Sequence, residues 1–186
     1  MVFEKKEYIL KDGTKIVIKT PEKNDAVGLL TSIINVCKST HNLLSEPEDF
    51  DIYLKNIKLE EDFIESFRTN NSYLLCVYLD GKIVGNCSLN LNCHIKDRHR
   101  ATVGIAIEKE YQGKGIGSIL FDELINIAKN INYIEQIELD VVSTNEIAKR
   151  LYTKNGFVKT GDIKRQLKLK DGSYLDGELM VLFLNK

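Results

Sequence analysis

The sequence predicts an α+β fold, in which strands joined by short turns are combined with amphipathic helices. Three Asp-Gly pairs, at positions 12–13, 80–81 and 171–172, lie between β-favouring segments and predict hairpins. Apolar residues also recur at helical spacing, most clearly over residues 115–131. Hairpins interleaved with helices indicate a mixed, mostly antiparallel twisted sheet.

The size and composition fit one globular domain, which we expect to span residues 1–186. The chain has 186 residues, of which 43% are hydrophobic and 28% charged. No low-complexity stretch, internal repeat or linker interrupts it. The formal net charge of −1 argues against a basic nucleic-acid-binding surface, so we expect no nucleic-acid partner.

Targeting signals and cysteine pairs are also lacking in the sequence. The first residues form no apolar signal-peptide core, and no apolar run is long enough to cross a bilayer. We therefore expect a cytoplasmic protein without a membrane partner. The four cysteines, Cys37, Cys76, Cys87 and Cys93, form no CxxC pair, and we expect packed or free thiols.

The N-terminal half predicts a hairpin and two helices. Strands 8–10 and 15–18 flank Asp12-Gly13, a type I′ turn signal. A helix is expected to begin at Pro21-Glu22, and a second one covers residues 59–67. Residues 45–48 are expected to form a loop between them. The predicted apolar faces of the two helices comprise Val27, Leu30, Ile33, Ile34 and Cys37, and Leu59, Phe63, Ile64 and Phe67.

Strands dominate the middle of the chain. Residues 73–79 and 82–89 form the second predicted hairpin, and residues 101–107 a third antiparallel strand. Gly104 within that strand indicates a bulge or a close approach by a ligand.

The last third predicts a helix, a strand, a short helix and a closing hairpin. The helix at 115–131 is followed by a strand at 137–142. Asn145 can cap the next helix, which Asn155-Gly156 ends with a left-handed cap. Phe157 begins the final strands.

A glycine-rich turn lies between strand 101–107 and the helix that follows. Gly113, Gly115 and Gly117 allow backbone N–H groups to approach a ligand without a Cβ in the way. The unpaired amides and the dipole of a helix N-terminus suit a phosphate or pyrophosphate. Lys114 could add a charge or could be solvated, and a glycine-rich turn without a ligand is the alternative.

Two other phosphate motifs are excluded by spacing. A dinucleotide-binding G-x-G-x-x-G needs a third glycine where this sequence has Ser118 or Leu120. A Walker loop needs Ser or Thr after Gly113-Lys114, and Gly115 follows instead.

Two motifs resemble the GNAT (GCN5-related) N-acetyltransferase family. Residues 112–117, Gln-Gly-Lys-Gly-Ile-Gly, match its Q/R-x-x-G-x-G/A signature, and residues 103–107 resemble the strand before it. Residues 145–157 resemble its second motif, N-x-x-A-x-x-L-Y-x-x-x-G-F. The resemblance is strong over about residues 101 to 157. The C-terminal stretch from Lys164 to Met180 is most similar to the ribosomal-protein and small-amine acetyltransferases.

The resemblance implies a GNAT fold, with helices on both faces of the sheet and acetyl-CoA in a V between the two splayed central strands, 101–107 and 137–142. It implies that strand residues bond the pantetheine arm, that loop amides hold the pyrophosphate, and that Asn145 contacts the pantetheine chain or simply caps its helix. The implied cofactor-binding residues are Ile105, Ala106, Ile107, Gln112, Gly113, Lys114, Gly115, Ile116, Gly117, Ser118, Asn145 and Tyr152.

The resemblance also implies direct transfer of the acetyl group to a primary amine of a small molecule or a protein N-terminus. Tyr152 matches the family tyrosine that protonates the leaving sulfur, and packing on the helix face is its alternative. Glu108 is our candidate for the general base. Glu110, Glu46 and Asp140 stay open, as does ordered water.

Other residue clusters favour no further chemistry. His41, His94, His99 and Cys93 fit no standard zinc spacing, so no metal site is expected. The carboxylates Glu46, Glu48, Asp49 and Asp51 could attract a cationic amine, although a solvated acidic loop is the simpler interpretation. An acyl-CoA-binding module without catalysis and an unrelated nucleotide-phosphate binder are the other function classes, and a homodimer is left open.

Overall fold

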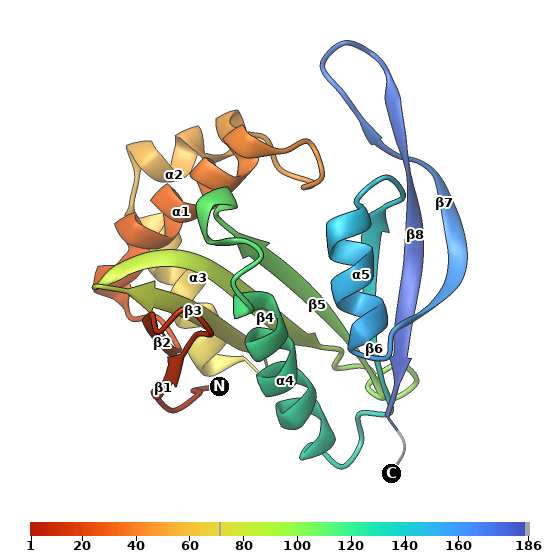
Figure 1. Cartoon of the computed structure of the whole chain (residues 1–186), viewed down its shortest axis with the longest axis horizontal. Coiled ribbons are helices and arrows are strands. Elements are labelled where there is room, and N and C mark those ends of the chain that lie inside the picture. The colour runs from red at the N-terminus through yellow and green to blue at the C-terminus, as the bar shows by residue number, and fades with distance from the viewer. Residues whose placement is uncertain (71, 185–186) are drawn as a thin grey trace. The chain divides into compact units, whose positions relative to one another are not determined.

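The computed structural model describes residues 1–70 and 72–184 (Figure 1). Its strands are β1 (Lys6–Ile9), β2 (Lys15–Lys19), β3 (Tyr73–Leu79), β4 (Lys82–Leu91), β5 (Arg100–Ile107), β6 (Gln136–Val142), β7 (Val158–Lys168) and β8 (Tyr174–Phe183). Its helices are α1 (Ala26–Ser39), α2 (Asp51–Lys55), α3 (Lys58–Thr69), α4 (Ile116–Lys129) and α5 (Glu146–Lys154). Short 3₁₀ turns are η1 (Lys23–Asp25), η2 (Pro47–Phe50) and η3 (Lys109–Tyr111).

The strands hydrogen-bond in the order β1-β2-β3-β4-β5-β6-β8-β7. The pairings β1–β2, β2–β3, β3–β4, β6–β8 and β7–β8 are antiparallel, whereas β5 and β6 are parallel. The predicted α+β class with a mixed, mostly antiparallel sheet is therefore confirmed.

Contacts within the chain define two compact units. The first unit comprises Met1–Asn90 and Gly104–Leu120, and the second comprises Leu91–Val103 and Phe121–Lys186. Strand β5 and helix α4 each contribute residues to both units.

Two of the three predicted Asp-Gly turns share one conformation. Leu10 N–H donates to the Thr14 carbonyl at 2.8 Å, and Leu169 N–H donates to the Ser173 carbonyl at 2.9 Å. In each turn the glycine has a positive φ, 85° and 88°, and the preceding aspartate does not. These are three-residue loops with a left-handed glycine, so the type I′ prediction for Asp12-Gly13 was wrong.

The Asp80-Gly81 turn differs because it contains only two loop residues. Leu79 pairs directly with Lys82 across it. Both loop residues have positive φ, 48° and 81°, which is the type I′ geometry. The number of loop residues, which the Asp-Gly pair alone does not reveal, decides between the two turn types.

A β-bulge lies in β4 directly after this turn. Val77 pairs with Gly85 and Tyr78 pairs with Ile83, so Val84 is the extra residue. Because side chains alternate between faces, the bulge places Ile83 on the face of Cys76 and Tyr78. A Cβ on Gly85 would lie 2.9 Å from the Ala106 carbonyl oxygen, so only glycine allows β4 to approach β5 this closely.

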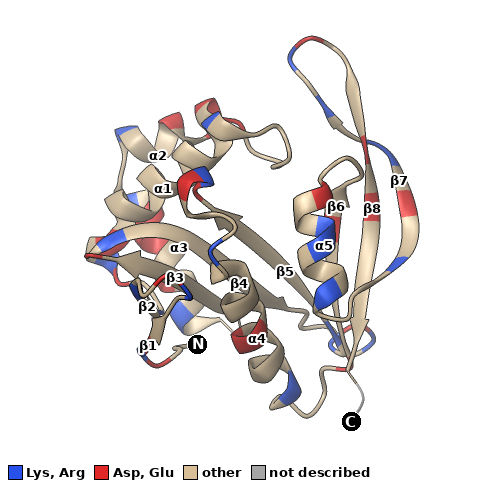
Figure 2. Ribbon diagram, viewed as in Figure 1, with Lys and Arg blue, Asp and Glu red and all other residues tan. Residues whose placement is uncertain are grey.

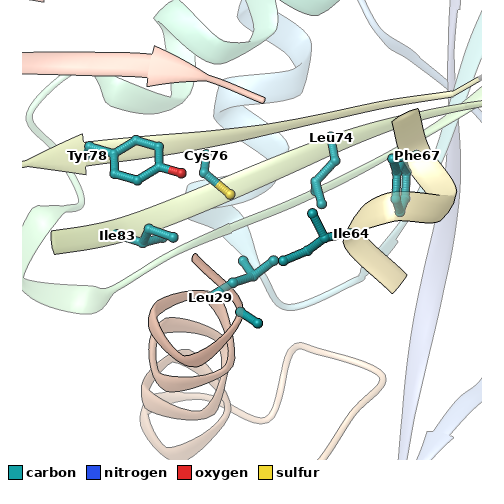
Figure 3. Packing of buried hydrophobic residues seen from close by; sticks show 8 residues of the cluster. Leu29, Ile64, Phe67, Leu74, Cys76, Tyr78 and Ile83 are labelled. Carbon is teal, nitrogen blue, oxygen red and sulfur yellow. The ribbon is translucent and has the colours of Figure 1, made fainter. Parts of the chain in front are cut away.

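The core of the first unit forms where α1 and α3 pack on β3 and β4. Figure 3 shows Leu29 of α1 and Ile64 of α3 facing Cys76, Tyr78 and Ile83. The whole cluster is Ala26, Leu29, Ile64, Phe67, Leu74, Cys76, Tyr78 and Ile83. Removal of this apolar surface from water is the main stabilising contribution in this unit.

The second unit has an aromatic core beside β6. Phe121, Tyr152 and Phe157 contact one another with ring centroids 5.3 to 6.1 Å apart. Residues of both charges are interspersed along α5 and β7 (Figure 2), and several pair, including Lys149 with Glu146 at 2.9 Å and Lys164 with Asp176 at 2.7 Å.

The helix predictions were only partly right about which residues are buried. Val27, Leu59 and Phe63 were predicted on apolar faces and are exposed, whereas the unpredicted Leu29 is buried. The residues after Ser45 form η2 and α2 rather than a plain loop. No helix among residues 1–70 and 72–184 is long and apolar enough to cross a membrane.

Candidate functional site

The end of β5 and the start of α4 are joined by a tight, internally bonded turn in the first unit. Glu108 N–H donates to the Val84 carbonyl at 3.0 Å, which anchors the end of β5 to β4. Tyr111 N–H then donates to the Glu108 carbonyl at 2.9 Å, closing η3. The side-chain amide of Gln112 donates back to the Ile107 carbonyl at 2.9 Å. Gln112 therefore fixes the turn, and its NH₂ group is engaged there.

The glycines of the loop adopt conformations that other residues rarely reach. Gly113 has φ +74° and Gly115 has φ +93°, both in the left-handed region. A Cβ on either glycine would meet no atom within 4 Å. Backbone conformation, and not crowding, therefore requires glycine at these two positions.

The loop delivers free backbone donors to the N-terminus of α4. Ile119 N–H donates to the Gly115 carbonyl at 3.2 Å, which makes Gly115 the residue that begins the helical ladder. The amides of Ile116, Gly117 and Ser118 precede this bond and have no acceptor within the helix. Unpaired amides and the positive end of a helix dipole suit an anion, and a pyrophosphate at this loop stays a prediction.

Glu108 is buried at the start of this turn. Its side chain is 5% exposed, and its Oε2 lies 3.1 Å from Lys82 Nζ. Its Oε1 is buried without a hydrogen-bond partner among the described residues. Hydrogen bonding to Glu108 raises the pKa of Lys82, which keeps the lysine charged.

Two lysines flank the Tyr111 ring of the same turn. Lys82 Nζ and Lys114 Nζ each lie 5.5 Å from the ring centroid, within the range of cation–π attraction. Asp12, at the tip of the β1–β2 hairpin, also interacts electrostatically with Lys114. Lys114 is exposed. Its interactions with the Tyr111 ring and with Asp12 nevertheless favour a position of its ammonium beside the glycine loop.

Strand residues Ile105, Ala106 and Ile107 complete the predicted site in the first unit. Ala106 is buried, whereas Ile105 and Ile107 are half-buried. A Cβ on Gly104 would lie 3.4 Å from Ser88 Oγ, and the bulge or close approach by a ligand expected at Gly104 stays a prediction.

Asn145, in the second unit, is the N-cap of α5. Its Oδ1 accepts the Ala148 N–H at 3.2 Å, as the sequence predicted. The cap uses the side-chain oxygen, which leaves the Nδ2 hydrogens as the donors that a ligand could use.

Tyr152 is buried on the inner face of α5. Its ring centroid lies 5.3 Å from that of Phe121 and 6.1 Å from that of Phe157. Burial raises the pKa of Tyr152 to about 12. The phenol is therefore protonated at neutral pH, as a proton donor must be.

The other predicted base candidates differ in surroundings. Glu110 is exposed, with Oε1 3.7 Å from Lys82 Nζ. Asp140 on β6 has its pKa raised, first by burial and then by Glu138. Glu46 N–H donates to Asp49 Oδ2 at 2.8 Å, so Asp49 of the acidic segment acts as a cap for η2.

His94 and His99, in the second unit, accept hydrogen bonds through their backbone carbonyls. The His99 carbonyl accepts from Glu135 N–H at 2.7 Å, and the His94 carbonyl accepts from Arg98 N–H at 2.8 Å. Within the part of the chain that is described, no three His, Cys, Asp or Glu side chains are grouped to hold a metal ion.

Sequence reasoning missed Lys82 and Tyr111 as neighbours of the site. Lys82 follows the two-residue turn opposite Leu79, close to the β4 bulge, whereas Tyr111 lies on η3. The Gly85 position, within a strand, is the one signal that could have indicated the bulge.

The chain is similar to several acetyltransferases. Residues 38–157, more than half of the chain, match the acetyltransferase (GNAT) family. L-amino acid N-acetyltransferase AaaT of Escherichia coli is 30% identical over 106 residues, which is 57% of this chain and 65% of that protein, slightly under two thirds.

Solved structures have the same fold. A GNAT-family acetyltransferase from Streptococcus pneumoniae has a TM-score of 0.83 and 28% identity, covering 91% of this chain and 99% of that one. YncA from Salmonella typhimurium, whose structure contains its cofactor acetyl-CoA, has a TM-score of 0.77 and 20% identity, covering 92% of this chain and 95% of that one. On the match over residues 38–157, the chain belongs to the acetyltransferase (GNAT) family, whose cosubstrate is acetyl-CoA.

Proposed function

We propose that residues 1–186 act as one acetyltransferase domain that transfers the acetyl group of acetyl-CoA to a primary amine. The observation that carries the proposal is the glycine loop. Gly113 and Gly115 adopt left-handed conformations directly before the free amides of α4, within the segment that matches the family. A loop of this geometry suits a pyrophosphate, which acetyl-CoA carries.

We assign the cosubstrate contacts to the residues of the two family motifs. In the first unit, amides of residues 113–118 hold the pyrophosphate, Lys114 adds a positive charge, and the backbone of Ile105–Ile107 bonds the pantetheine arm as a strand would. In the second unit, Asn145 donates through Nδ2. Gln112 contributes by fixing the turn, since its side chain is bonded to Ile107.

The chemistry requires two proton movements. The amine nitrogen attacks the thioester carbonyl, the N–C bond forms, and the C–S bond breaks. The amine proton goes to a base, for which Glu108 is the assigned residue, and the leaving thiolate takes a proton from Tyr152. The raised pKa of Tyr152, about 12, keeps the donor protonated.

The acceptor is an amine whose identity must be measured. AaaT is named for action on L-amino acids, so these belong in the first panel, beside polyamines, aminoglycosides and N-terminal peptides. The assay follows release of free CoA thiol with each amine. We expect amine-dependent release and an acetylated product of the corresponding mass.

Two results would contradict the proposal. Binding of CoA without amine-dependent turnover over the whole panel would indicate a binding module without catalysis. A thermal shift with ATP or NAD but none with CoA would indicate a different nucleotide-phosphate binder.

A further inference from the structure

The unsatisfied oxygen of Glu108 needs an explanation. A buried carboxylate oxygen without a hydrogen bond is destabilising, and most buried polar atoms in native proteins are paired. Glu108 Oε2 is bonded to Lys82, whereas Oε1 is buried and unpaired within residues 1–70 and 72–184. One oxygen of the same carboxylate is therefore fixed, and the other remains as an acceptor.

Lys82 reaches Glu108 because of the local geometry of β4. Lys82 pairs with Leu79 after the two-residue Asp80-Gly81 turn. The extra residue Val84 reverses the facing of the residues between it and the turn. Lys82 shares the face of its cross-strand partner Leu79, whereas Ile83 shares the face of Cys76 and Tyr78 in the apolar core of the first unit.

Lys82 also contacts the rest of the turn. Its Nζ lies 3.7 Å from Glu110 Oε1 and 5.5 Å from the centroid of the Tyr111 ring. Its side chain is 50% exposed, so the ammonium keeps part of its hydration. It interacts at the same time with Glu108, Glu110 and Tyr111 of one turn.

We infer that Lys82 is a positioning residue for the proposed acetyl transfer, holding Glu108 so that Oε1 accepts the N–H of the acceptor amine. This inference rests on the proposed function. The bond from Lys82 Nζ to Oε2, at 3.1 Å, fixes the rotation of the carboxylate. Oε1 then takes one proton from the amine nitrogen as the N–C bond forms, and Glu108 becomes a neutral acid that returns the proton to water after product release.

The alternative role for Lys82 is structural support of the glycine loop. Through Tyr111, which also contacts Lys114, it could set the shape of the glycine loop and thereby the affinity for acetyl-CoA. The two roles separate in kinetics, since a base acts on kcat at saturating cosubstrate and a loop contact acts on cosubstrate binding.

The experiment compares Lys82→Met with Lys82→Arg and with Lys58→Met. Lys58 is a matched control, because it is 59% exposed and also pairs with two carboxylates, Asp62 at 2.7 Å and Glu61 at 3.7 Å. With the best amine, we expect Lys82→Met to lower kcat by about tenfold or more, with the Kd for acetyl-CoA changed by less than about twofold. Lys82→Arg should recover part of the loss, and Lys58→Met should match the unmodified protein.

A double-mutant cycle with Glu108→Gln excludes a merely structural effect. If Lys82 acts through Glu108, Lys82→Met should cause little further loss of kcat in the Glu108→Gln background. Additive losses would overturn the inference, as would an unchanged kcat with weaker acetyl-CoA binding in Lys82→Met. Lys82→Gln, which keeps a polar side chain, replaces Lys82→Met if the latter does not fold. Absence of turnover in the unmodified protein is a separate result, which removes the proposed function itself.

Discussion

Arg100 and Glu138 form a two-pronged ion pair in the second unit, where β5 and β6 run parallel. Arg100 Nε and Nη2 donate to the two carboxylate oxygens of Glu138, each at 2.6 Å. The Glu138 side chain is 8% exposed and that of Arg100 43%. A buried charge without a partner of opposite charge is strongly destabilising. The ion pair with Arg100 therefore offsets most of the desolvation penalty of the Glu138 carboxylate.

The first prediction is that Arg100→Met destabilises the protein at neutral pH. Because solvent screens the half-exposed Arg100, we expect a loss of about 1–2 kcal/mol in the free energy of unfolding, less than for a fully buried pair. The bond with Arg100 lowers the pKa of Glu138. The stabilisation is thus present above the usual range of a glutamate and is lost as pH falls below it.

Urea unfolding of both proteins at pH 7 and at pH 3 measures this difference. The gap should shrink at the lower pH. Lys5→Met serves as the control, since its pair with Glu7 is exposed and should contribute little. A gap of the same size at both pH values would rule out the ion pair as the cause.

The second prediction concerns Glu60, whose carboxyl group lies on the buried face of α3 with Ile64 and Phe67. Burial raises its pKa to about 7. The unfolded chain releases this proton at lower pH than the folded one, so stability should fall as pH rises from the usual glutamate range to about 7. Glu60→Gln removes the charge, and we expect a gain of roughly 2 kcal/mol at pH 8 and little change near pH 4.

Thermal or urea unfolding across pH 4 to 8 tests this expectation. The neighbouring Glu61→Gln is the matched control, because Glu61 is half-buried and pairs with Lys58. If Glu60→Gln and Glu61→Gln had parallel stability profiles, Glu60 would not be the titrating group.

The third prediction is that Tyr152→Phe lowers kcat by roughly 10²-fold while leaving the fold intact. Phenylalanine keeps the contacts with Phe121 and Phe157, so only the hydroxyl that we propose as the proton donor is lost. Since the pKa of Tyr152 is about 12, its deprotonation should not limit kcat of the unmodified protein below about pH 11. Tyr133→Phe, which removes a hydroxyl elsewhere in the second unit, should leave kcat unchanged; an equal effect of both substitutions would reject the assignment.

The fourth prediction compares two left-handed glycines. Gly115→Ala and Gly13→Ala both place a Cβ at a positive φ, +93° and +85°, with no atom within 4 Å. Each should lose about 1 kcal/mol of stability through backbone strain. Only Gly115→Ala should also weaken CoA binding, measured by calorimetry, because the amides of this loop are the ones proposed to hold the pyrophosphate. Equal CoA affinity in both variants would exclude the loop as the cradle.

Sequence patterns were sufficient for most elements, because each was marked by local chemistry. The Asp-Gly pairs, the Asn145 cap and Gly156, with φ +90°, each fix a boundary by their own backbone preferences. The glycine loop was predictable for the same reason.

Long-range effects were beyond the sequence patterns. The β4 bulge depends on how two strands pair, and the contact of Lys82 with Glu108 joins residues far apart in the sequence. No single residue indicates either feature. Glu60 also interrupts an apolar face, and its burial depends on what packs against α3. The base and the acceptor amine remain proposals for the same reason, since they depend on side chains brought together by folding.

The shared turn of the first and last hairpins bears on the order of folding. In both β1–β2 and β7–β8, the chain reverses through three residues, so loop closure is entropically cheap and the hairpins can form within microseconds. The parallel pairing of β5 with β6 joins residues separated by all of α4 and requires a much longer closure. We therefore expect the two ends of the chain to acquire structure early, and the parallel junction at Arg100 and Glu138 to be the late, rate-determining step of folding.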